Sequence, residues 1–365
     1  KKLRIYLLNT RMTNLKEITN RFGGLWRYPN LKDYFFLVNP YFPNSAILKE
    51  LQNNFSSLAT QYPSNLKHQN ILASKLFNIH HENLVVCNGV SEIINILPDI
   101  FNGKFGVITP TFNEYINAIG KDRIYLSNVK NVSFKYSIKE LYELSEHCKN
   151  IILINPDNPS ANLIAKSELL VFLDFLKDKN KNLIIDESFI DFSDPDGVNK
   201  MLFQETILKY ENLLIIKSIG KSYGVPGIRL GIVSSSSKAL LLEITKRLCI
   251  WNINSIAETF LEIMPKYLNI FDDACRKMIN EREIFYKELD TISFLTPFPS
   301  FSNYILCKIS KKFTSVSLAE KLFNEGYIIK HLSEKIDKER GEYIRLSIRD
   351  RIDNKGLIQV LQKLD

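Results

Sequence analysis

Short apolar runs alternate with amphipathic segments along most of the chain. Each run consists mainly of Val, Ile, Leu or Phe and is followed by turn residues, a pattern typical of a buried strand. We expect such strands at 84–87, 105–109, 151–154, 183–186, 213–217 and 229–233. Apolar residues recur at helical spacing between several of them, at 137–147, 166–177 and 238–248. The alternation predicts an α/β fold with a mostly parallel sheet between layers of helices.

The pattern changes after Trp251. A long helix is expected within 253–289, and it is followed by short strands at 303–309, 327–330 and 343–348. These elements predict a smaller α+β domain against which the N-terminal arm packs. We therefore assign a large domain to 45–252 and a small domain to 1–44 together with 253–365.

The loop after the predicted strand at 213–217 combines an amine, hydroxyl groups, several glycines and an arginine. The amine of Lys221 can form a Schiff base with pyridoxal phosphate (PLP), while hydroxyls and the Arg229 guanidinium can hold the cofactor's phosphate. Glycines let the backbone approach a ligand closely. For Lys221 alone, a solvated lysine on a surface loop is the ordinary interpretation.

Two polar residues follow neighbouring apolar runs. Asp186 ends the run at 183–186, and a carboxylate in a dry site can keep the pyridine nitrogen of PLP protonated. Asn158 stands between Pro156 and Pro159 and offers a neutral donor for the cofactor's phenolic oxygen. Asp186 could instead cap a helix, and the Asn-Pro segment could be an ordinary turn.

A strand, a glycine turn and a helix start succeed one another at 84–94. Val90 and Ser91 open that helix, where free backbone N–H groups, the helix dipole and a hydroxyl favour an anion. Phe112 follows the next apolar run and could stack on a pyridine ring, although a phenylalanine in that place is more often part of a core.

The order of these motifs resembles that of fold-type I PLP enzymes of the class I/II aminotransferase family. Within it, the chain is most similar to the threonine-phosphate decarboxylases and histidinol-phosphate aminotransferases, from Phe22 to the C-terminus. The resemblance implies the PLP-dependent transferase fold, of the aspartate aminotransferase type, with a seven-stranded type of sheet in its large domain, and PLP as cofactor. A joint occurrence of five motifs in sequence is far more specific than any one of them.

The resemblance also implies roles in the cofactor site. Lys221 would carry the Schiff base and move the proton, Asp186 would pair with the ring nitrogen, Asn158 with the phenolic oxygen, and Phe112 would stack on the ring. The phosphate would be held by Val90, Ser91, Ser218 and Arg229. Tyr62, in Gln61-Tyr62-Pro63, would reach the phosphate of the neighbouring subunit, which implies a homodimer.

The substrate site is implied in the same way. Arg345 would bind the substrate's α-carboxylate through two hydrogen bonds. Lys330, Asn39 and Arg349 are further candidates for substrate binding.

Several positions depart from the family's pattern. Phe189 stands where the aminotransferases carry tyrosine and the threonine-phosphate decarboxylases carry phenylalanine, which favours decarboxylation. Phe22, Leu37 and Lys330 replace a histidine, an asparagine and an arginine that hold the substrate phosphate in those decarboxylases. The cofactor site therefore matches the family, whereas the substrate site is altered.

Three functions follow from these residues. The first is decarboxylation of a small, phosphorylated amino acid, and the alternative is transamination with a 2-oxo acid. A non-enzymatic regulator or binding module is the third, which the complete set of lysine, aspartate, asparagine and arginine disfavours.

Composition agrees with a cytoplasmic enzyme. A chain of 365 residues with 45% hydrophobic content can bury a large core. No apolar run approaches the roughly 18–20 residues that span a bilayer, and no secretory pattern opens the chain. The five cysteines lack C-x-x-C spacing, which indicates reduced thiols, and the histidines lack ligand spacing, so we expect no metal.

The net charge of +8 is spread over the whole chain and interleaved with acids. This distribution indicates a solvated surface, so we expect neither nucleic acid nor a membrane as partner. The chain opens at Lys1 without methionine, as a processed chain or one domain of a longer polypeptide would.

Overall fold

The computed structural model describes residues 15–21, 23–310 and 312–365, which form two compact units. The large unit comprises Val38–Glu283 and Pro299–Asn303, and the small unit comprises the described residues up to Leu37, those of Ile284–Phe298 and those of Tyr304–Asp365. Residues 253–283, which the sequence placed with the small domain, lie in the large unit because α11 (Ser255–Ile263) packs against α2 (Ser45–Thr60) and α3 (Leu66–Phe77).

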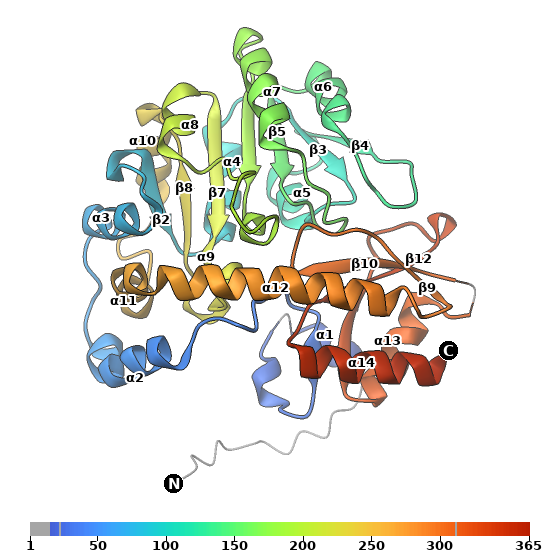
Figure 1. The fold of residues 1–365 in the computed structure, drawn as a ribbon. Helices are drawn as coiled ribbons and strands as arrows, with labels where there is room; N and C mark the ends of the chain where they lie inside the picture. The colour runs from blue at the N-terminus through green and yellow to red at the C-terminus, as the bar shows by residue number, and fades with distance from the viewer. Residues whose placement is uncertain (1–14, 22, 311) are drawn as a thin grey trace. The chain divides into compact units, whose positions relative to one another are not determined.

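The large unit is built on a seven-stranded sheet with the strand order β2-β8-β7-β6-β5-β3-β4 (Figure 1). Its strands are β2 (Leu84–Cys87), β3 (Phe105–Thr109), β4 (Ile124–Asn128), β5 (Asn150–Ile154), β6 (Asn182–Asp186), β7 (Leu213–Ser218) and β8 (Gly231–Ser234). Strands β3 to β7 run parallel, and β8 runs antiparallel to both of its neighbours. The predicted α/β fold with a mostly parallel sheet is confirmed.

Helices cover both faces of this sheet. Val107 packs into the apolar cluster around α4 (Val90–Ile100), whereas a Cβ on its neighbour Gly106 would meet Leu144 of α6 (Ile138–His147) at 2.8 Å. Consecutive strand residues point to opposite faces, so α4 and α6 lie on opposite sides of the sheet. The further helices are α5 (Asn113–Ile119), α6 (Ile138–His147), α7 (Lys166–Asp178), α8 (Gln204–Lys209), α9 (Ile219–Ser222), α10 (Lys238–Arg247) and α12 (Leu268–Leu289).

The small unit contains a five-stranded sheet with the order β1-β11-β12-β10-β9. Its elements are α1 (Leu15–Thr19), β1 (Lys32–Tyr34), β9 (Leu295–Pro297), β10 (Tyr304–Ile309), α13 (Ser315–Asn324), β11 (Tyr327–His331), β12 (Glu342–Ser347) and α14 (Arg351–Leu364). Strand β1 pairs in parallel with β11, and the other pairs are antiparallel.

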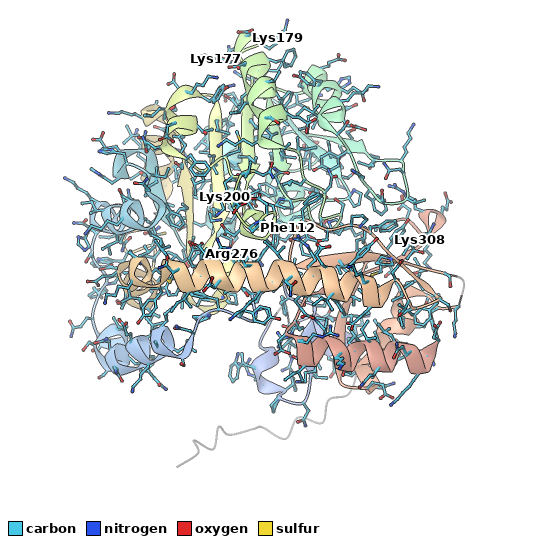
Figure 2. The ribbon with its side chains drawn as sticks, viewed as in Figure 1. Phe112, Lys177, Lys179, Lys200, Arg276 and Lys308 are labelled. Carbon is cyan, nitrogen blue, oxygen red and sulfur yellow. The ribbon has the colours of Figure 1, made fainter. Side chains whose placement is uncertain are left out.

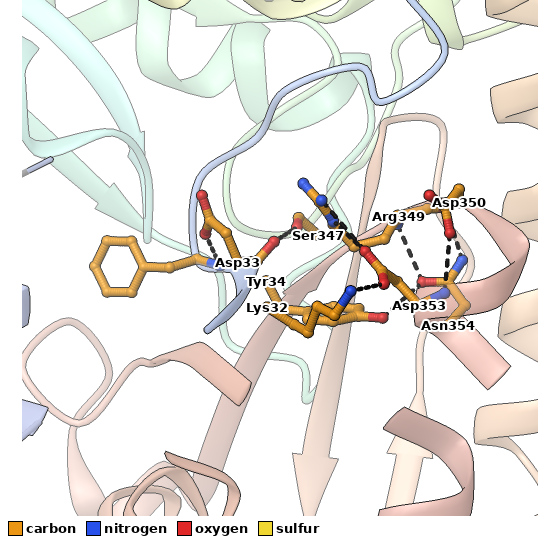
Figure 3. A network of polar contacts seen from close by, with 9 residues as sticks. Lys32, Asp33, Tyr34, Ser347, Arg349, Asp350, Asp353 and Asn354 are labelled. Atoms are coloured by element: carbon orange, nitrogen blue, oxygen red, sulfur yellow. Dashed lines mark hydrogen bonds and ion pairs between the residues drawn. The ribbon is translucent and has the colours of Figure 1, made fainter. Parts of the chain in front are cut away.

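Polar contacts fasten the N-terminal strand to the C-terminal helix (Figure 3). Lys32 Nζ lies 2.6 Å from Asp353 Oδ1, and the Tyr34 hydroxyl donates to Asn354 Oδ1 at 3.1 Å. Strand β1 (Lys32–Tyr34) is thus an integral part of the small unit. The departure from the family's pattern at Phe22 lies outside the described residues.

Within the described ranges, the helices fall short of the length and apolar character that a membrane span requires.

Candidate active site

A cavity of ≈ 160 Å³ opens at the carboxyl ends of the central strands of the large unit. Open α/β sheets place their ligands at this edge. The cavity brings together residues from five separate parts of the sequence that were predicted to hold the cofactor, namely Val90, Ser91, Phe112, Asn158, Asp186, Ser218, Lys221 and Arg229.

Asp186, the last residue of β6, is buried and hydrogen-bonded at both carboxylate oxygens. Its Oδ2 accepts from the Tyr115 hydroxyl at 2.8 Å, and its Oδ1 accepts from the backbone N–H and the hydroxyl of Ser188 at 2.9 and 2.5 Å. Burial raises the pKa of the carboxyl, and these bonds and the charge of Lys221 act against that rise. A cationic ring nitrogen beside Asp186 would favour its ionised form.

The ends of β6 and β7 are joined through Ser188. Its hydroxyl oxygen accepts the backbone N–H of Ser218 at 3.0 Å, directly before the short helix that carries Lys221. The amine-bearing helix is therefore fixed to the strand that carries Asp186. Sequence reasoning missed both Ser188 and Tyr115 as supports of the carboxylate.

The segment around Lys221 is also held from the N-terminal side. The Lys221 carbonyl accepts the Asn39 backbone N–H at 3.0 Å, and Asn39 Nδ2 donates to the Ser222 carbonyl at 2.9 Å. The structure thus places Asn39 as a buried support of the lysine segment, and a contact between Asn39 and substrate stays a prediction.

The start of α4 and Arg229 form a cradle for an anion. Arg229 NH2 donates to Ser91 Oγ at 3.2 Å, and a Cβ on Gly89 would come within 2.6 Å of the same guanidinium nitrogen. Gly89 and Arg229 both have positive φ, of 74° and 57°, which turns the two segments toward each other. Backbone N–H groups, a hydroxyl and a guanidinium fit the phosphate of PLP.

Aromatic and amide groups line the rest of the cavity. Phe112 lies directly before α5, just beyond the end of β3 (Figure 2). It is 38% exposed and lines the cavity, so part of its side chain is accessible to a ligand. Asn158 and Phe189 are buried at its wall. Asp157 fixes the Asn158 loop by accepting from Thr111 Oγ1 and Ser160 Oγ at 3.2 and 2.7 Å.

Tyr62 is the one predicted cofactor residue that does not line this cavity. It is 77% exposed and stacks on Trp251, with ring centroids 4.2 Å apart. A highly exposed tyrosine held by a second aromatic ring is consistent with a contact to another subunit, which stays a prediction.

Two predicted substrate residues are neighbours in the small unit. Arg345 on β12 is paired in register with Lys330 on β11. Arg345 NH2 donates to the Phe35 carbonyl at 2.8 Å, and Lys330 Nζ lies 4.8 Å from the centroid of the Phe35 ring.

The electrostatics of this pair favour an anionic ligand. Burial lowers the pKa of Arg345 to about 10, and burial and the charge of Arg345 lower the pKa of Lys330. An anion bound between two desolvated cations would offset their mutual repulsion.

Arg349, the remaining predicted substrate residue, belongs to a structural network. Its Nε and NH2 both lie 3.3 Å from Asp353 Oδ2, and Asp353 also binds Lys32 (Figure 3). This ion pair fastens the start of α14, and a role of Arg349 in substrate binding stays a prediction.

Comparisons with known proteins agree with this geometry. Residues 38–361 match the family described as aminotransferase class I and II. The chain is 30% identical over 349 residues to L-serine phosphate decarboxylase of Campylobacter jejuni, which covers 89% of this chain and 86% of the relative. It is also 29% identical over 345 residues to CMP-5'-(3-aminopropyl)phosphonate synthase of Streptomyces rubellomurinus, which covers 94% of this chain. The chain spans about half (54%) of that relative's length.

Among solved structures, the histidinol-phosphate aminotransferase of Clostridium acetobutylicum superposes with a TM-score of 0.81 at 25% identity. The match covers 92% of this chain and 99% of that one. The predicted resemblance is confirmed, and PLP, the cofactor of the family, fits the carboxylate, the amine and the anion cradle of the cavity. The chain belongs to the class I and II aminotransferase family of PLP-dependent enzymes.

Proposed function

We propose that the chain decarboxylates a small amino acid that carries a phosphate or phosphonate group. The observation that carries this proposal is Phe189, an apolar ring 5% exposed in the wall of the cofactor cavity beside Asp186 and Asn158. A tyrosine in its place would add a second donor to the cofactor's phenolic oxygen. The names of the Campylobacter and Streptomyces relatives, a serine phosphate decarboxylase and a synthase of an aminopropyl phosphonate, support the same substrate class.

PLP supplies an electron sink that stabilises the electrons left on Cα when a bond to that carbon breaks. Asp186 would hold positive charge at the pyridine nitrogen, and Tyr115 and Ser188 keep its carboxylate in place. Lys221 would supply the amine that binds the aldehyde of PLP, and its free amine would act as a proton carrier. Ser91 and Arg229 would bind the cofactor's phosphate, and Phe112 would offer its ring to the cofactor.

The substrate's own anionic groups would be met by the two cations of the small unit. Arg345 binds the α-carboxylate, and Lys330 on the neighbouring strand binds the phosphate. Since the name of the Streptomyces relative denotes a CMP-linked phosphonate, the proposed class includes amino acids whose phosphate carries a nucleotide.

Transamination is the second candidate, supported by the histidinol-phosphate aminotransferase among the superposing structures. The same residues would serve both reactions, because an electron sink and a proton carrier are needed whether the bond from Cα to the carboxylate or the bond to hydrogen breaks. Arg345 can hold either orientation of the substrate.

We further infer a homodimer in which Tyr62 of the partner subunit completes the phosphate site, and a cytoplasmic location. The exposed stack of Tyr62 on Trp251 supports the dimer.

Product analysis tests the reaction. The PLP-loaded protein is incubated with serine phosphate, threonine phosphate and histidinol phosphate, with and without 2-oxoglutarate. Carbon dioxide released without the oxo acid would establish decarboxylation, and strict dependence on 2-oxoglutarate would establish transamination. A lack of turnover of all three, and of the cytidine 5'-phosphodiester of serine, in both conditions would contradict the proposed substrate class.

A further inference from the structure

A second cavity, of ≈ 310 Å³, lies wholly within the small unit. Its walls come from α1, from the start of α13 and from the end of β11, and include Thr19, Asn20, Phe35, Val316, Lys330 and Glu334. By the same measure it is about twice as large as the cofactor cavity of ≈ 160 Å³. A group larger than the phosphate of a small amino acid fits it.

This cavity adjoins the position proposed for the substrate's phosphate. Lys330 belongs to its wall and is also the register partner of Arg345. Phe35 links the same two cations, because its carbonyl accepts from Arg345 at 2.8 Å and its ring lies 4.8 Å from Lys330 Nζ. A substrate with its carboxylate on Arg345 and its phosphate on Lys330 would therefore direct any substituent of that phosphate into the cavity.

The wall of the cavity carries charges of both signs. Besides the cations Lys16 and Lys330, it has the carboxylates of Glu320 and Glu334. A phosphate monoester carries a charge of about −1.5 to −2 at neutral pH, which the cations attract and the carboxylates repel. A diester carries a single charge, and hydroxyl groups on its substituent can donate to carboxylates.

We propose that the preferred substrate is a phosphodiester of the amino acid, and that this cavity binds the hydroxyl-bearing substituent, a nucleoside, on the far side of the phosphate. The inference rests on the proposed function and adds to it the site that distinguishes a substituted phosphate from a free one. The polar side chains of Asn20 and Ser333 supply further partners for a sugar and a base.

Three substrates test the proposal, namely O-phosphoserine, its methyl phosphodiester and its cytidine 5'-phosphodiester. We expect kcat/KM for the cytidine diester to exceed that for the methyl diester by about tenfold or more, as one or two added hydrogen bonds would give. Equal values for the two diesters, or a preference for O-phosphoserine, would overturn the proposal.

A substitution that fills the cavity makes the test specific. Val316 lines the cavity at the start of α13 and is 37% exposed, so Val316→Trp adds bulk there without disturbing a core. It should lower kcat/KM for the cytidine diester about tenfold and leave that for the methyl diester unchanged. Val171→Trp, at a 62% exposed helix position of the large unit, is the matched control and should change neither value.

Equilibrium binding separates this inference from the proposed reaction. The affinities of the two diesters are compared by calorimetry in wild type and in Val316→Trp. If decarboxylation proceeds and the substituent has no effect on turnover or binding, the cavity inference is wrong and the proposed reaction stands. If no substrate is decarboxylated but the cytidine diester binds more tightly, and Val316→Trp removes that difference, the reaction is wrong and the cavity inference stands.

Discussion

At the scale of single residues, the carboxylate of Asp186 is held in a fixed position by the protein itself. Its carboxylate is buried, and three hydrogen bonds from two residues fix both of its oxygens. A group that is fixed before the ligand binds loses little free energy to reorganisation when charge develops beside it.

Asp186→Asn should retain PLP but lose about 10²–10³-fold in kcat, because a neutral amide cannot stabilise positive charge at the ring nitrogen. The measurements are cofactor content by absorbance and steady-state kinetics. Asp174→Asn, which changes an aspartate with 57% side-chain exposure on α7, is the control and should behave as wild type. Wild-type turnover by Asp186→Asn would show that this carboxylate does not contact the cofactor nitrogen.

Lys330 should discriminate between phosphorylated and plain amino acids. Lys330→Ala removes one cation beside Arg345, and we expect kcat/KM for phosphorylated substrates to fall about 10–100-fold, the loss of a charged hydrogen bond. Inhibition by plain serine should be unaffected. Lys338→Ala, at an exposed position of the same unit, is the control. An equal loss for both kinds of ligand would contradict the phosphate role.

At the scale of elements, the segment after α9 is held in a conformation that only glycine tolerates at one position. Gly224 has φ 65°, and a Cβ there would lie 1.7 Å from the Phe42 carbonyl oxygen. Gly224→Ala should therefore lower the free energy of unfolding by about 1–3 kcal/mol and displace the Lys221 segment. Gly227→Ala, whose Cβ would meet nothing within 4 Å, is the matched control. Equal urea midpoints for the two variants would argue against this strain.

Glu187, directly after β6, makes the free energy of unfolding depend on pH. Glu187 accepts the backbone N–H groups of Met201 and Leu202 at 2.5 and 3.1 Å, and burial raises its pKa from 4.5 to about 7. The folded state therefore binds this proton more tightly than the unfolded state, so the contribution of Glu187 to stability falls as pH rises from about 4.5 to about 7. Lys217 and Asp191 also act on this carboxyl.

Glu187→Gln should remove that contribution and flatten the change in unfolding free energy between about pH 4.5 and 7. Urea titrations at several pH values measure it. Glu211→Gln, at an exposed position, should keep the wild-type dependence. An unchanged slope in Glu187→Gln would assign the effect to other groups.

Sequence patterns predicted those strands and helices whose own residues show an apolar run or an amphipathic repeat. Buried apolar runs identified six strands of the large sheet, but β4 was missed because Tyr125 and Leu126 are exposed on an edge strand. Strand β1, only three residues long, was missed because its place is fixed by pairing with β11, almost 300 residues away. Motifs that follow strand ends predicted residues that line one cavity, whereas Tyr115 carries no local sign of its bond to Asp186, which lies 71 residues further on.

At the scale of the whole molecule, the exposed position of Tyr62 predicts shared sites in a dimer. Tyr62→Phe keeps the ring that stacks on Trp251 but removes the hydroxyl, so PLP affinity should fall about 5–10-fold while the dimer persists. Sedimentation and PLP titration measure the two properties. A monomer in solution, or wild-type PLP affinity in Tyr62→Phe, would contradict the role of the partner subunit's tyrosine.

The pairing of β1 with β11 has a consequence for how substrate preference can change in this family. The N-terminal segment contributes α1 and Phe35 to the second cavity, joins the sheet only at its edge, and supplies none of the residues that line the cofactor cavity. Substitutions in about twenty residues at the start of the fold can thus reshape what lies beyond the substrate's phosphate without altering the PLP chemistry. Selectivity and catalysis occupy separate stretches of the chain and can evolve, or be exchanged between relatives, independently.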